Sequence, residues 1–164
     1  MRSSALAWNE YSELQVFVGE CRAEVEAAFG TGTLLVEHGA ADFHSLWDCV
    51  CHAHVHVVPM CEIEVALRVP EVVPRYMNGV ATFRQDDYAS IRGHLLHLPE
   101  YLTLTVGGEI WIGTPKPLVR HGSRYLIADL CGVGEERVDW GVVPRGTLFR
   151  ESLELLTSRR GSYG

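Results

Sequence analysis

The sequence predicts a mixed α+β domain built around an antiparallel sheet. Three observations favour this class. Apolar residues recur at helical spacing over residues 9–29, histidines alternate along residues 52–58, and two glycines join a pair of apolar runs over residues 101–112. With 164 residues, 47% of them hydrophobic and 21% charged, the chain is long enough for one domain over residues 1–164 and too short for two of ordinary size.

The first predicted element is an amphipathic helix from Asn9 to Phe29. Its apolar residues recur at spacings of three and four, with glutamates between them: Leu14, Phe17, Val18, Cys21, Val25 and Ala28. Gly30 and Gly32 are expected to end it. A short strand is then predicted over residues 33–36, stopping at the triplet Glu37-His38-Gly39.

Outside the histidine segment, prolines, polar runs and glycines indicate where the other predicted elements begin and end. Pro70, Pro74 and the polar run 84–90 predict irregular structure in the middle of the chain. Residues 101–106 and 109–112, joined by Gly107-Gly108, predict a hairpin. Residues 124–130 are expected to form another strand, and residues 147–159 a final helix.

Net charge, hydropathy and cysteine content limit the partners and the cellular compartment that we expect. The net charge of −7 gives no general attraction to nucleic acid or to an anionic membrane. No stretch is long and apolar enough to span a bilayer, and the first residues lack the hydrophobic core of a signal peptide. Five cysteines form no regular framework, so we expect reduced thiols in the cytoplasm.

The histidine strand is the strongest functional signal. Side chains at i, i+2 and i+4 of a strand point the same way, so His52, His54 and His56 are expected to share one face. The residues between them, Ala53, Val55 and Val57, suit a buried opposite face. Because three imidazoles side by side lose solvation unless something polar occupies their face, the array predicts a reactive centre.

Two chemistries use such an array. Imidazole is a common ligand of zinc and iron, so the three histidines could activate water in a metalloenzyme. Alternatively, one neutral imidazole attacks phosphorus while its neighbours stabilise the phosphate oxygens and the leaving group. A third reading keeps the strand in a nucleotide-binding module without catalysis. The residues alone leave these alternatives open.

The segment from His52 to Pro59, His-Ala-His-Val-His-Val-Val-Pro, resembles the signature of the histidine triad (HIT) superfamily. The helix, the strand ending Glu37-His38-Gly39 and the loop into the histidines follow the order of one HIT-like branch, and the resemblance is strong over residues 9–60. It implies an antiparallel sheet packed on a long helix. It further implies that His54 is the nucleophile, that His56 assists the leaving group, and that His52 orients its neighbours.

The same resemblance implies a phosphohydrolase or nucleotidyl transferase that forms a covalent histidine intermediate, needs no metal or other cofactor, and works as a homodimer. The substrate would be a small phosphorylated or nucleotidylated molecule. Glu37 falls where many members have an asparagine near the phosphate, and Asp48 and Cys49 fall near contacts to the leaving group. His38 and His44 lie in the segment that should approach the histidines, so we include them among the substrate-binding candidates.

The chain departs from the family at its start. HIT domains begin with a hairpin and a lysine-bearing strand that build much of the nucleoside pocket, whereas this chain begins almost at the helix and has Lys116 as its only lysine. The N-terminal hairpin, with its part of the nucleoside pocket, is therefore expected to be missing, replaced by later elements, or lost through a misplaced start codon. Its absence suggests a specialised substrate instead of a general nucleotide. A carboxylate at Glu37 or at Asp48 would also be unfavourable close to a phosphate, unless it is protonated or turned away.

Overall fold

The computed structural model describes residues 7–40, 54–117 and 122–133, together with Arg150, Glu154 and Thr157. The elements in chain order are α1 (Trp8–Phe29), β1 (Gly32–Ala40), β2 (His54–Met60), α2 (Glu62–Tyr76), β3 (Met77–Arg84), α3 (Tyr88–Leu96), β4 (Glu100–Val106), β5 (Glu109–Pro115) and α4 (Gly122–Cys131). The strands form one antiparallel sheet in the order β2-β1-β4-β5-β3. The predicted α+β class with an antiparallel sheet is confirmed.

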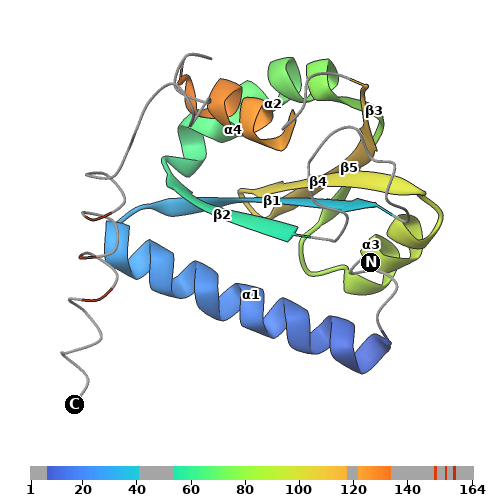
Figure 1. The fold of residues 1–164 in the computed structure, drawn as a ribbon, viewed down its shortest axis with the longest axis horizontal. Coiled ribbons are helices and arrows are strands. Elements are labelled where there is room, and N and C mark those ends of the chain that lie inside the picture. Colours follow the sequence, from blue (N-terminus) through green and yellow to red (C-terminus); the bar gives the residue numbers. More distant parts are fainter. Residues whose placement is uncertain are drawn as a thin grey trace.

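Helices cover both faces of this sheet, with α2 and α4 on one side and α1 and α3 on the other (Figure 1). The larger core lies under α2 and α4, where valines of α2 pack against the leucines of the central strands. A smaller core on the other side joins α3 to Tyr101 and Ile112. Each strand therefore presents one set of side chains to each helical layer, which decides where every candidate residue points.

The first helix is close to the prediction. Tyr11 and Ala28 are buried on its inner face, and Gly30 ends it in the left-handed conformation, with φ of 66°. The following strand, β1, is longer than predicted and runs through Glu37, His38 and Gly39 to Ala40. It is paired along both edges, with β2 on one side and β4 on the other, and these ladders keep the chain extended past residue 36.

The histidine strand is described from His54 onward and continues past Pro59 to Met60, where it was predicted to stop before the proline. Pro59 is tolerated because β2 is an edge strand paired only with β1 among the described residues, so the missing N–H need not leave a gap in a central ladder.

Two further predictions are wrong. The region of Pro70 and Pro74 is helical: it forms α2, whose buried side chains recur at helical spacing, namely Val65, Val69, Val72, Val73 and Tyr76. Both prolines lie on the exposed side of the helix. Burial of the valine stripe against the sheet stabilises the helix enough to offset the cost of the prolines, about 3 kcal/mol each.

Residues 124–130 were expected to form a strand and instead lie within α4. The run is short and apolar, so its periodicity fits both a strand and a helix. Packing against α2 and β1 buries Leu126 and Leu130 on one helical face, and this decides the outcome. The predicted final helix over residues 147–159 lies outside the described residues except for Arg150, Glu154 and Thr157, all three in helical conformation.

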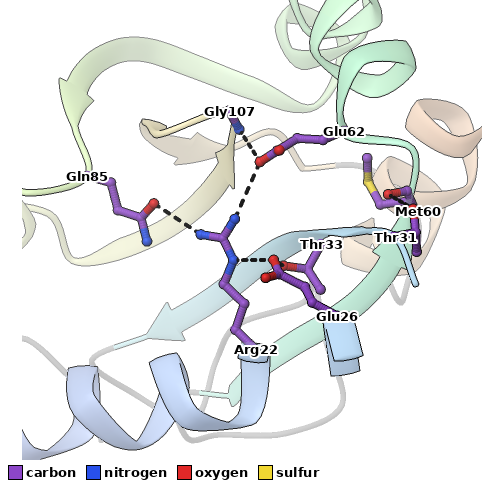
Figure 2. Close-up of polar contacts among 8 residues, drawn as sticks. All are labelled: Arg22, Glu26, Thr31, Thr33, Met60, Glu62, Gln85 and Gly107. Carbon is purple, nitrogen blue, oxygen red and sulfur yellow. Dashed lines mark hydrogen bonds and ion pairs between the residues drawn. The ribbon is translucent and has the colours of Figure 1, made fainter. Parts of the chain in front are cut away.

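A polar network ties α1 to the rest of the fold (Figure 2). The guanidinium of Arg22 donates hydrogen bonds to the carboxylates of Glu26 at 2.7 Å and Glu62 at 3.4 Å, and to the Gln85 side chain at 3.2 Å. The hydrogen bond from Arg22 lowers the pKa of Glu26, so this carboxylate stays ionised at neutral pH. One arginine thus joins α1 to the start of α2 and to the segment after β3.

Within the described part of the chain, no helix has the length and apolar character that crossing a bilayer requires.

Candidate active site

The candidate site lies at the start of the histidine strand, on the sheet face that α2 and α4 cover. His54 and His56 are both partly buried and are two residues apart on β2. Their ring centroids are 5.0 Å apart and the ring planes are nearly perpendicular, at 86°. Val58 continues the same face and packs against the larger core. The two imidazoles therefore lie side by side, close enough to contact one phosphoryl group.

A third imidazole joins them from the neighbouring strand. His38 pairs directly with His54 in the β1–β2 register, and the centroids of their rings are 5.6 Å apart. Its side chain is only 1% exposed. The buried His38 ring meets the His54 ring edge to face, at 76°, which restricts the orientation of His54.

His38 is itself held by a carboxylate that sequence reasoning did not single out. Its Nε2 lies 2.9 Å from Oε1 of Glu100, the first residue of β4, whose side chain is 28% exposed. The two residues are 62 positions apart, and only the pairing of β4 with β1 brings them together. No local motif marks Glu100. Glu100 could have been identified only by predicting that the hairpin over residues 101–112 pairs with the strand that carries His38.

The Glu100 contact fixes the tautomer that we expect for His38. An ionised carboxylate only accepts hydrogen bonds, so Nε2 of His38 must carry the proton. In the neutral ring the lone pair then sits on Nδ1. Nitrogen-15 NMR of the imidazoles should show a proton on Nε2 of His38, and Glu100→Ala should remove this preference for Nε2. Glu64→Ala, which removes an exposed carboxylate of α2, is the matched control and should leave the spectrum unchanged. An Nδ1–H form in the wild type would contradict this hydrogen bond.

Glu37 lies on the other side of the sheet from the histidines. Because β1 continues past residue 36, side chains alternate there, and Glu37 faces α1 while His38 faces α2 and α4. Its Oε1 accepts a hydrogen bond of 2.6 Å from the hydroxyl of Tyr101. Glu37 is thus turned away from the histidine face, which is one of the two ways in which its conflict with a bound phosphate is avoided.

Four predicted site residues lie outside the described residues: His44, Asp48, Cys49 and His52. The expectation that His52 shares a face with His54 and His56 therefore stays a prediction. Over residues 7–40, 54–117 and 122–133, the structure contains no set of three or more histidine, cysteine or acidic side chains arranged to hold a metal ion.

Comparisons with protein-family models, with curated proteins and with solved structures found no match to this chain.

The described geometry is suited to acid–base or nucleophilic chemistry. Imidazoles change protonation near neutral pH, so two of them side by side can act as a nucleophile and a proton donor in the same step. The third, His38, is fixed by Glu100 and borders the pair. The site thus consists of one buried histidine, His38, bound to a carboxylate, and two partly exposed histidines, His54 and His56, on β2.

Proposed function

We propose that this chain is a HIT-like phosphohydrolase or nucleotidyl transferase that works through a covalent intermediate on His54. The observation that carries the proposal is the pairing of His54 and His56, with ring centroids 5.0 Å apart on one face of β2, in a segment whose sequence matches the HIT signature. The substrate is a small molecule that carries a phosphoryl or nucleotidyl group.

In the first step a ring nitrogen of neutral His54 attacks phosphorus. An N–P bond forms, the bond from phosphorus to the leaving group breaks, and the leaving group takes a proton from His56. In the second step His56 takes a proton from water or from another acceptor. The acceptor oxygen attacks phosphorus, the N–P bond breaks, and His54 returns to its neutral form.

The neighbouring residues support this assignment of roles. His38, bound to Glu100, borders His54 and limits the ways in which its ring can turn. A nucleophile held in one orientation reaches phosphorus without the entropy cost of ordering it first. We assign His38 and Glu100 as positioning residues, a task that the family resemblance gives to His52.

A hairpin of the fold pairs with β1, the strand that precedes the histidines. HIT domains place a hairpin ahead of the helix, whereas here the hairpin of β4 and β5 pairs with β1 and arrives after the histidine strand. This supports a HIT-like sheet completed by later elements.

The proposal is tested by trapping the intermediate. The wild type is incubated with nucleoside phosphoramidates, dinucleotides and acyl-adenylates, then quenched without acid, because an N–P bond to histidine is acid-labile. Intact-protein mass spectrometry should show the chain heavier by the transferred group, and peptide mapping should place that group on His54. His97→Ala, which removes an exposed histidine at the end of α3, is the matched control and should still form the adduct.

An adduct on another residue would overturn the assignment of the nucleophile. The absence of adduct and product across the whole panel would overturn the proposed function. Metal bound in stoichiometric amount through dialysis, and lost in His54→Ala, would instead establish the metalloenzyme.

A further inference from the structure

A row of apolar side chains lies on the outer face of α2, on the side turned away from the valines that this helix buries. The row begins with Ile63 and Leu67, whose exposed fractions are 74% and 78%. Pro70 and Pro74, both exposed, continue it. The steps of four, three and four residues bring all four side chains within about 60° of one another around the helix axis. Single apolar residues on a surface are ordinary, but a row that shares one face indicates a partner. We call these four residues the α2 stripe.

The α2 stripe is separate from the contacts that hold α2 in the fold. The buried valines of the helix pack on the sheet from its inner face. One flank of α2 adjoins α4, where Asp129 accepts a hydrogen bond of 2.8 Å from the Tyr76 hydroxyl. The backbone carbonyl of Asp129 also accepts from the Arg68 guanidinium at 3.3 Å. Because the α2 stripe takes part in neither set of contacts, the packing of α2 in the described fold does not account for it.

The chain leaves α4 beside this helix. α4 ends at Cys131, and a Cβ at the next residue, Gly132, would lie only 2.5 Å from Nη1 of Arg68. Arg68 follows Leu67 in the sequence and lies about 100° further around α2. Residues 134–164 therefore start next to α2, on the flank that adjoins the α2 stripe.

This part of the chain contains a segment that suits an apolar face. The sequence predicts a helix over residues 147–159, and its leucines fall on one side: Leu148, Leu155 and Leu156. The structure describes Arg150, Glu154 and Thr157 of this segment, all exposed and in helical conformation. Their spacing of four and three places them on the side opposite the leucines. The segment thus has a polar side for solvent and an apolar side that needs a surface.

The dimensions of the two parts agree. The α2 stripe extends about 17 Å from Ile63 to Pro74, and a helix over residues 147–159 would extend about 20 Å. Residues 134–146 span up to about 40 Å when extended, which is enough to reach either end of the α2 stripe. A helix this short is marginally stable alone in water, so it would gain its stability from packing on an apolar surface.

We propose that residues 147–159 dock as an amphipathic helix on the α2 stripe of the same chain. The leucines of the segment pack against Ile63 and Leu67, and its polar side stays in solvent. Docking removes from water apolar surface of both partners, which is the driving force for the contact. The α2 stripe faces away from the histidines, so the proposal does not depend on the function proposed above.

Hydrogen exchange of the full chain, read by mass spectrometry of its peptic peptides, tests whether the segment is held. Peptides from residues 147–159 should exchange slowly in the wild type, as in a packed helix. Leu67→Glu places a charge in the α2 stripe and should make them exchange at least about tenfold faster, because a charge is unfavourable in an apolar contact. Leu96→Glu makes the same change at an exposed leucine of α3, and this matched control should leave their exchange unchanged. Circular dichroism establishes that each variant is folded.

Photo-crosslinking identifies the surface that the segment contacts. Leu67 is replaced by benzoylphenylalanine in the full chain, and the product of irradiation is mapped by peptide mass spectrometry. The link should join position 67 to residues 147–159, and the product should run as a monomer on a denaturing gel. The same probe at position 96 should give no link to this segment.

Slow exchange in the wild type that is lost in Leu67→Glu and kept in Leu96→Glu, together with a link inside one chain, would support the docking. Equal exchange of residues 147–159 in the wild type and Leu67→Glu, whether fast or slow, would overturn it. A link from position 67 to any other segment would overturn it as well. A link between two chains would assign the α2 stripe to an interface between copies and would also reject the proposal.

Discussion

His54→Ala is expected to lower turnover of any substrate that gives the covalent intermediate by at least about 10³-fold, because the variant has no atom that can form the N–P bond. Folding should be preserved. Among the described residues β2 is an edge strand, and His54 on it is only partly buried, so its removal leaves the larger core intact. Steady-state rates with the reactive member of the nucleotide panel, read beside the thermal midpoint, give the result. More than a tenth of the wild-type rate would contradict the role of His54.

His56→Ala separates the two roles on the same strand. A general acid contributes about 10²- to 10⁴-fold, but only where the leaving group needs a proton. The loss should therefore be large for substrates with basic leaving groups and small for those with acidic ones, such as a nitrophenolate. His54→Ala should lose both alike. Equal loss in His56→Ala for both kinds of substrate would show that His56 does not protonate the leaving group.

Gly39→Ala is expected to destabilise the fold by about 3 kcal/mol, a large effect for one methyl group. A Cβ at position 39 would lie 2.4 Å from Cζ of Tyr101, whose ring crosses the glycine directly. Tyr101 is fully buried in the smaller core and its hydroxyl is bound to Glu37, so the ring cannot swing aside without breaking other contacts. Urea unfolding followed by circular dichroism measures the change.

Two further variants isolate the cause. Gly93 lies in α3 with nothing within 4 Å of an added Cβ, so Gly93→Ala should be neutral or stabilising, by up to about 1 kcal/mol. In a double-mutant cycle, Gly39→Ala should cost much less in a Tyr101→Leu background, because the clashing ring atoms are gone. Additive free energies of unfolding would show that the ring contact is not the source of the cost.

The elements with strong local signals could be predicted from the sequence. The first helix has a sustained apolar period and a glycine at its end, and the hairpin has its two turn glycines, so each was placed close to its observed bounds. The histidine strand was recognised by alternation. What failed were short segments whose outcome depends on packing. The prolines of α2 suggested a break, yet burial of its valines decides in favour of a helix.

The candidate site divides in the same way. Alternation correctly predicts that neighbouring residues of a strand face opposite ways, but it separates Glu37 from His38 only if β1 extends that far. β1 is extended by its pairing with β4, and no local sequence pattern predicts this pairing. Glu100 was missed for that reason, because its contact with His38 joins residues 62 positions apart.

The order in which the sheet is assembled affects how the chain reaches its native state. β1 is flanked by β2, which follows it directly, and by β4, which is synthesised only after α2, β3 and α3. A nascent chain that has just completed the histidine motif therefore still exposes one edge of β1, including the backbone beside His38. Open edges of this kind invite pairing with other chains. Contacts this distant in sequence also form slowly. Premature termination before Glu100 would thus yield a product that carries the entire motif, lacks its carboxylate support, and is prone to aggregate.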